Sequence, residues 1–119
     1  MNTRLLKPDI LFALLPPEPQ LRPELALLCQ QVAQADGTHL ILDLSRVEII
    51  TSPSIGGLLT LRSRLSELGR KLILCNTRLA TKCIFRVAGL ESVFDFTRDK
   101  SDALKAICGW ERPTIKVRC

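Results

Sequence analysis

Three hydroxyl side chains stand around one proline in the segment Thr51-Ser52-Pro53-Ser54. The segment follows an apolar run and precedes a helical pattern, so its amides lie at a helix N-terminus, where negative charge is favoured. In a structural interpretation, Ser52 is the N-cap and Pro53 the first helical residue, which stabilises the helix by about 1 kcal/mol. In a regulatory interpretation, a kinase phosphorylates one of these hydroxyls, and the phosphate binds the helix amides or repels an acidic partner. From the residues alone we favour the cap, and the regulatory interpretation makes this turn the best candidate for a functional site.

The residues needed for catalysis or metal binding are scarce. His39 is the only histidine, and nothing near it in sequence indicates a Ser–His or Cys–His pair, so we expect it to be a surface or packing residue. The five cysteines are odd in number and include no C-x-x-C pair, so they indicate neither a disulfide framework nor a zinc site. No glycine-rich phosphate-loop motif is present. We therefore expect no enzymatic activity, no metal and no cofactor, and a location in the reducing cytoplasm.

Asp43 interrupts an otherwise apolar strand over residues 40–44. Its carboxylate belongs at the carboxyl end of a sheet, which is where open α/β sheets bind ligands. The alternative, which we favour, is that the carboxylate accepts hydrogen bonds from amides of nearby loops. Nucleotide binding at this end of the sheet is a third and weaker hypothesis.

Apolar patterns divide the chain into alternating strands and helices. They predict strands over residues 10–15, 40–44, 71–75 and 93–96, and helices within residues 21–36, 54–68, 77–89 and 101–108. This alternation predicts an α/β domain with a mostly parallel central sheet of four or five strands and about four helices. Right-handed crossovers are expected between the parallel strands.

The third of these helices has an apolar stripe with helical spacing, which is typical of a face turned towards a hydrophobic core. We expect either Asn76 or Thr77 to cap this helix and Gly89 to end it. The members of the stripe are Ala80, Cys83, Ile84, Val87 and Ala88.

Length and charge restrict the classes of protein that remain. The 119 residues fit one domain over residues 1–109 and a tail over residues 110–119, in which residues 114–117 alternate weakly. The tail would add an edge strand or pair with a second subunit as a homodimer. The net charge of +5 is spread over several segments and only 4% of residues are aromatic, so we expect no direct binding of nucleic acid. The apolar run over residues 10–15 is too short to span a membrane.

Three segments resemble the STAS domain, the fold of anti-sigma-factor antagonists that is also found at the tails of sulfate transporters. They are LILDLSRVEIITSPSIGGLLTLRSRL, GRKLILCN and IFRVAGLESVFDF. The family has D-S-[ST]-G-[LI]-G between an apolar strand and a helix, then G-x-[KR]-L-x-L-x-N, and finally Gly-Leu before the last strand. The resemblance covers residues 10–107 and implies a single STAS-type α/β domain.

The resemblance also implies a function in signalling. Signalling members of the family bind an anti-sigma factor that is also a Ser/Thr protein kinase, and phosphorylation of the conserved turn breaks the complex. By this resemblance the chain is a non-enzymatic bacterial signalling module that regulates transcription. Its partner-binding surface is the turn, the helix that follows and neighbouring loops, with Thr51, Ser52, Pro53, Ser54, Ile55, Gly56 and Arg62.

The turn departs from the family pattern at the positions that matter most for a switch. Thr51 stands where the family has Asp, Ser52 matches the first Ser, Pro53 occupies the usual acceptor position, and Ser54 replaces Gly. The phosphorylation candidates are therefore Ser52, Ser54 and Thr51. The loss of the usual acceptor favours an alternative function, in which a small STAS subunit docks on a membrane transport ATPase without phosphorylation.

Overall fold

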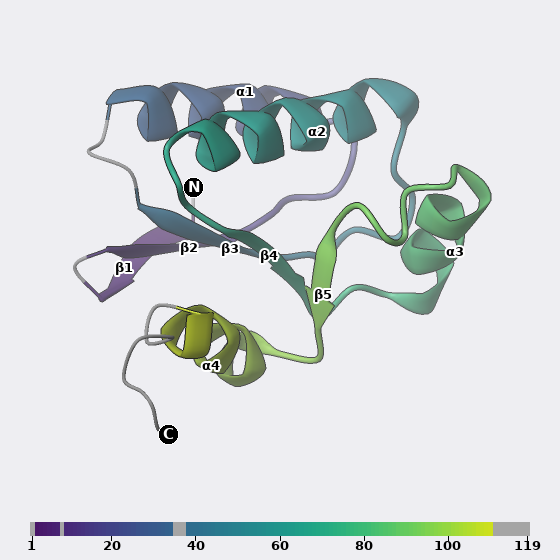
Figure 1. The fold of residues 1–119 in the computed structure, drawn as a ribbon. Helices are drawn as coiled ribbons and strands as arrows, with labels where there is room; N and C mark the ends of the chain where they lie inside the picture. The colour runs from purple at the N-terminus through teal and green to yellow at the C-terminus, as the bar shows by residue number, and fades with distance from the viewer. Residues whose placement is uncertain (1, 8, 35–37, 111–119) are drawn as a thin grey trace.

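The computed structural model describes residues 2–7, 9–34 and 38–110, which form one α/β domain (Figure 1). The predicted fold class is confirmed, with four helices and a mostly parallel sheet of five strands. In chain order the elements are β1 (Asn2–Lys7), β2 (Ile10–Leu14), α1 (Leu21–Gln34), β3 (His39–Asp43), α2 (Ser52–Glu67), β4 (Leu72–Cys75), α3 (Leu79–Val87), β5 (Asp95–Thr97) and α4 (Lys100–Trp110).

The sheet has the strand order β1-β2-β3-β4-β5, in which β2 to β5 are parallel and β1 is antiparallel to β2. Ile41 in the central strand β3 pairs in register with Phe12 of β2 and Ile73 of β4. The sequence did not predict β1. This strand lies at the edge of the sheet, where Leu5 is 61% exposed, so it lacks the continuous apolar run of a buried strand.

Helices cover both faces of the sheet, as Figure 1 shows: α1 and α2 lie on one face, α4 lies on the other, and α3 lies at the end beside β5. Every residue of β3 and β4 is consequently buried. The larger of two apolar clusters includes side chains of α1, α2 and Phe85 of α3, whereas the smaller joins the opposite face of the sheet to Ala103 and Ile107 of α4. The loop over residues 44–51 between β3 and α2 contacts α3, because Thr81 donates to the carbonyls of Val47 and Glu48.

The prediction for the cap of α3 is wrong, whereas the prediction for the tail is untested. Arg78, and not Asn76 or Thr77, is the residue that precedes the first turn of α3. Asn76 has a φ of +53°, and its side-chain amide donates to Asp43, so this residue is part of a turn before the helix. The predicted edge strand at residues 114–117 lies outside the described residues, and its role in a homodimer stays a prediction.

Candidate functional site

The helix α2 begins at Ser52, which is two residues before the start of the apolar pattern and one residue before Pro53, the first helical residue in the capping interpretation. The carbonyl of Thr51 accepts the first helical hydrogen bond, from the amide of Ile55 at 3.0 Å, and Thr51 has extended backbone angles. These features make Thr51 the N-cap and Ser52 the first helical residue, so the prediction of Ser52 as N-cap is wrong. The hydroxyl of Thr51 makes no capping bond to its own helix, since it is engaged elsewhere.

A carboxylate from a distant loop holds the N-terminus of α2. Glu18, which lies 33 residues earlier in the chain, accepts hydrogen bonds from both the amide and the hydroxyl of Thr51, each at 3.0 Å. The hydroxyl of Ser54 lies 3.4 Å from that of Thr51. A negative charge at this position is favoured by the helix dipole, so Glu18 occupies the place where a bound anion would otherwise be expected.

The same contacts set the charge of Glu18. Partial burial by itself raises the pKa of this carboxyl, but the hydrogen bonds from Ser54 and from the amide and hydroxyl of Thr51 lower it below the ordinary value. A carboxyl whose folded pKa is lowered stabilises the fold above its ordinary pKa, and this stabilisation is lost as the pH falls through the folded pKa. Glu18 is therefore a charged part of the turn at neutral pH.

We expect Glu18→Gln to lower the free energy of unfolding at pH 7 by about 1 kcal/mol, because charged hydrogen bonds become neutral ones. Chemical denaturation at pH 7 and at a pH low enough to protonate the carboxyl tests this, since the difference should shrink where wild-type Glu18 is itself protonated. Glu67→Gln, at the exposed far end of α2, is the matched control and should show no such loss at pH 7. A difference of equal size at both pH values would contradict the assigned charge.

An apolar groove lies next to this turn, between the start of α2 and the outer side of α3. Its volume is about 370 Å³. We call it the α2–α3 groove, and its lining residues are Ile50, Ser52, Ile55, Cys83, Ile84, Val87 and Ala88. Six of these seven side chains are apolar or a thiol, and the exception is the exposed hydroxyl of Ser52.

The groove corrects the prediction for α3, because only Ile84 of its apolar stripe packs against the core. The fully buried residues of α3 are Thr81 and Phe85, and Val87 is 89% exposed. Phe85 contacts the rings of Phe94 and Phe96 edge-on, with ring centroids 5.4 Å and 5.6 Å apart. The aromatic cluster fixes the inner face of the helix, which leaves most of the predicted stripe on the surface.

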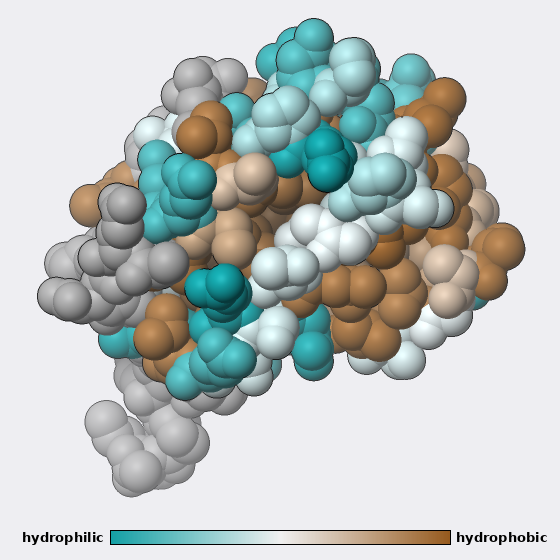
Figure 2. Space-filling view, turned by 90° about the horizontal axis from the view of Figure 1, so that it is seen from above, coloured by the Kyte–Doolittle hydropathy of each residue, from teal (hydrophilic) through white to brown (hydrophobic). Residues whose placement is uncertain are grey.

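Further apolar side chains enlarge this surface. Ile49 of the β3–α2 loop and Leu79 at the start of α3 are both exposed large hydrophobic residues, as is Val87. Figure 2 shows a broad brown area on the right-hand side of the view, which is the side of α3 in Figure 1. An exposed apolar area that gathers several large side chains in one place is typical of an interaction site.

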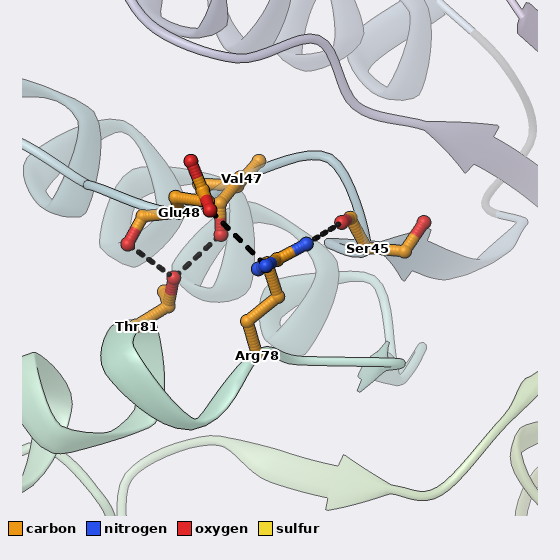
Figure 3. A network of polar contacts seen from close by, with 5 residues as sticks. All are labelled: Ser45, Val47, Glu48, Arg78 and Thr81. Atoms are coloured by element: carbon orange, nitrogen blue, oxygen red, sulfur yellow. Dashed lines mark hydrogen bonds and ion pairs between the residues drawn. The ribbon is translucent and has the colours of Figure 1, made fainter.

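A polar network joins the two walls of the groove (Figure 3). The buried hydroxyl of Thr81 is shared between the backbone carbonyls of Val47 and Glu48, the second at 3.0 Å. The guanidinium of Arg78 donates to the Ser45 carbonyl at 3.3 Å and to the Glu48 carboxylate at 3.1 Å. Both donors belong to α3 or its N-cap, and all the acceptors belong to the β3–α2 loop, so the network fixes the loop against the helix.

Comparison with models of protein families assigns the chain to a family. The model of the STAS domain matches residues 20–103, which is more than half of the chain. The chain belongs to the STAS domain family. No curated protein matches its sequence.

Solved structures share the fold of this STAS domain at low sequence identity. The unphosphorylated anti-sigma-factor antagonist SpoIIAA aligns with a TM-score of 0.76 and 16% identity, over 91% of this chain and 96% of SpoIIAA. A STAS domain protein from Planctomyces limnophilus aligns with a TM-score of 0.77 and 18% identity, over 91% of this chain and 99% of its own. Phosphorylated SpoIIAA of Bacillus aligns with a TM-score of 0.61 and 17% identity, over 89% of this chain and 97% of its own. The structural neighbours of this STAS domain are thus anti-sigma-factor antagonists.

The STAS domain places the predicted site residues on different surfaces. Ser52 and Ile55 line the α2–α3 groove, and Arg62 lies two helical turns beyond Ile55 on the same side of α2. Thr51 and Ser54 are turned towards Glu18 instead, and Ser54 is fully buried. Pro53 lines a second groove, between α1 and α2, and Gly56 contributes a carbonyl that accepts from the Thr60 hydroxyl.

The sequence did not identify the residues that hold the turn and the β3–α2 loop in place. Glu18, Arg78 and Thr81 act through contacts between segments that are about 30 residues apart, so no local motif announces them. The groove residues of α3 did leave a signal, the apolar stripe, but its spacing is the same whether the core or a partner covers it.

Asp43 has the structural role that we favoured. Its carboxylate accepts the Ser45 amide at 2.8 Å and the Asn76 side-chain amide at 2.9 Å, so both of its oxygens bind loop amides. Burial, together with the carboxylates of Asp43 and Asp99, raises the pKa of the adjacent Cys75 thiol to about 12. This thiol is protonated at neutral pH and does not act as a nucleophile there.

His39 is likewise a packing residue, as predicted. It is buried, and its Nδ1 accepts the backbone amide of Lys71 at 3.0 Å. Within the described residues, no cluster of three His, Cys, Asp or Glu side chains is placed to hold a metal ion. None of the helices in this part of the chain combines the length and the apolar character that crossing a membrane requires.

Proposed function

We propose that this STAS domain is a cytoplasmic signalling module of the anti-sigma-factor-antagonist type, which binds an anti-sigma factor through the α2–α3 groove. The observation that carries the proposal is the position of Ser52, whose exposed hydroxyl lies in the wall of an apolar groove. A partner that fills the groove would bury Val87 and its neighbours, and it would also cover Ser52. A phosphate once attached to that hydroxyl would therefore be incompatible with the bound partner.

The chemistry of the groove supports a protein partner. Apolar side chains in a shallow depression gain free energy when a partner removes them from water, and clusters of this kind provide the central contacts of many interfaces. The rigid network of Thr81 and Arg78 holds both walls before the partner arrives, so little ordering has to occur on binding.

Ser52 is the best acceptor for a regulatory phosphate. Ser54 is fully buried, and the hydroxyl of Thr51 is bound to Glu18, whereas Ser52 is exposed. A phosphate on Ser52 would add nearly two negative charges beside an apolar surface. Such a charge would oppose docking of an apolar partner surface, and phosphorylation would release the partner.

Purified protein, an anti-sigma-factor kinase encoded in the same genome and ATP provide the test. We expect a complex by calorimetry in the absence of ATP and, with ATP, phosphate on Ser52 and none on Ser54. Ser52→Ala should lose the phosphate and still bind, because a small exposed side chain contributes little to the complex. A phosphate on Ser54, or on neither residue, would contradict the switch, and no complex with any such kinase would contradict the proposed function.

A second candidate function keeps the groove but has no phosphate. Pro53 removes the usual acceptor, and Glu18 already binds the amide of Thr51, so the turn is complete without modification. In this alternative the same surface docks on the ATPase of a membrane transport system. The variant Ser52→Asp separates the two functions. If phosphate controls binding, Ser52→Asp should weaken the complex with the kinase. If the domain instead binds the ATPase with Ser52→Asp as it does in wild type, the alternative is supported.

A further inference from the structure

The first half of α2 carries no charged side chain. Residues 52–61 have none, although 24% of the whole chain is charged, whereas residues 62–67 include three charged side chains. This half of the helix is not hidden inside the fold, since Ser52, Pro53 and Thr60 are exposed. Figure 2 looks onto α1 and α2 and shows pale residues of neutral hydropathy across this face. Charged residues are depleted at the centres of protein–protein interfaces, so this composition indicates a contact surface.

Gly56 lies in the middle of this uncharged half, and the fold does not require a glycine there. Its backbone is helical, and a Cβ atom added to it would meet no heavy atom of the described residues within 4 Å. Gly57 differs, because a Cβ atom there would lie 3.3 Å from the Leu25 Cδ1 atom of α1, so this glycine allows the two helices to pack. A glycine inside a helix makes it less stable than an alanine does. Gly56 therefore lowers the stability of α2 without serving a contact within the part of the chain that the structure describes.

A glycine at such a position allows another backbone to approach the helix closely. Gly56 follows Ser52 by one helical turn and adjoins Ile55, and both of these residues line the α2–α3 groove. A molecule that fills this groove and continues across α2 would therefore pass over Gly56. The contact surface thus extends from the apolar groove onto a part of α2 that has neither charge nor side-chain bulk at its centre.

The hydrogen bonding of α2 restricts the conformation of the partner at this point. Amides and carbonyls in the interior of a helix are paired with each other, and the carbonyl of Gly56 also accepts from the hydroxyl of Thr60 at 3.0 Å. An extended segment that lay on Gly56 would find no backbone partners there, so its own buried N–H and C=O groups would stay unpaired. A helix pairs its backbone groups internally, and it can pack against a glycine at a short interaxial distance.

We propose that an α-helix of the protein partner crosses α2 at Gly56, with its backbone against the glycine and one of its apolar side chains in the α2–α3 groove. This inference rests on the proposed function, because it specifies the contact by which the same partner is bound. It also gives a steric reason for control at Ser52. This hydroxyl lies one turn before Gly56 on the same side of α2, so a phosphate on it would occupy the space of the crossing helix.

Gly56→Ala, tested with the anti-sigma-factor kinase of the same genome, should make the free domain more stable and the complex weaker. We expect the midpoint of thermal unfolding to rise by about 2–6 °C, because alanine favours the helix. We expect the dissociation constant from calorimetry to rise by about tenfold or more, because the added methyl group overpacks the helix contact. Ser66→Ala, at the exposed far end of α2, is the matched control, which also favours the helix and should bind as wild type does.

The unfolding midpoint and the dissociation constant should rise together only if Gly56 serves the contact with the partner. Binding of Gly56→Ala with wild-type affinity would overturn the inference and leave the proposed function intact. A lower unfolding midpoint in Gly56→Ala would also overturn it, because the glycine would then serve the fold. Equal losses of affinity in Gly56→Ala and Ser66→Ala would show that the partner responds to a more stable helix and not to a closer contact, which is a third contrary result. If the wild-type protein forms no complex, the proposed function fails and the inference fails with it.

Discussion

Val87→Asp is expected to weaken binding of the anti-sigma factor by about 100-fold without unfolding the domain. Val87 lies in the wall of the α2–α3 groove and is 89% exposed, so it contributes little to the stability of the free protein. In the proposed complex the same position would be buried, and an aspartate there would bring an unpaired charge into an apolar contact. Changes of this kind at the centre of an interface cost 2 to 4 kcal/mol, roughly 30- to 1000-fold. Calorimetric titration with the purified partner measures the loss.

The experiment needs a control for the general effect of a new surface charge. Leu27 is also a large exposed apolar residue, but it lies on α1 and outside both grooves. Leu27→Asp should leave the affinity within a few-fold of wild type. Normal binding by Val87→Asp would exclude the α2–α3 groove as the interface. So would equal losses in both variants, because those would report a change in net charge rather than in contact.

The effect of Val87→Asp also separates docking from switching. Ser52→Ala removes the proposed acceptor and leaves the apolar walls intact, whereas Val87→Asp removes the docking surface and leaves the acceptor exposed. If docking precedes phosphate transfer, Val87→Asp should therefore also lower the rate of Ser52 phosphorylation. If the kinase phosphorylates Val87→Asp as fast as it phosphorylates the wild-type protein, it recognises the turn without the α2–α3 groove.

The fold was predicted from segments whose amino-acid composition matches their burial in the structure. The apolar strands β3 and β4 are buried over their whole lengths, and their composition alone indicated a sheet covered on both faces. The turn at residues 51–54 was placed correctly because Pro53 and its hydroxyl neighbours belong at a helix N-terminus. The order of the elements then followed from their alternation.

The parts that could not be predicted depend on contacts between distant segments. The sequence shows the apolar stripe of α3 that contains Val87. It does not show that Thr81 and Phe85, on the opposite face of the helix, are the residues that are buried. It likewise shows Glu18 only as an acid in a proline-rich loop, since its partner Thr51 lies 33 residues further on. The candidate site was therefore located by the turn, and its real extent became visible only with the tertiary contacts.

Thr81→Val is expected to lower the free energy of unfolding by about 2 kcal/mol, although the two side chains have nearly the same shape. The variant keeps the methyl group and loses the hydroxyl, so the carbonyls of Val47 and Glu48 lose a donor in a buried place. Leaving such groups unsatisfied costs about 1–3 kcal/mol. Thr81→Ser is the complementary variant, which keeps the hydroxyl and loses only a methyl group, at about 1 kcal/mol. Chemical denaturation of the two variants measures both losses.

The order of the two losses decides what Thr81 does. If the hydroxyl fixes the β3–α2 loop against α3, valine must be the more damaging change, and it must also weaken partner binding, because the loop provides Ile50 to the groove. The added loss of affinity reports how much the fixed position of the loop contributes to partner binding. If serine is the more damaging change, Thr81 acts by packing, and the two walls of the groove are held together by Arg78 and the apolar contacts alone.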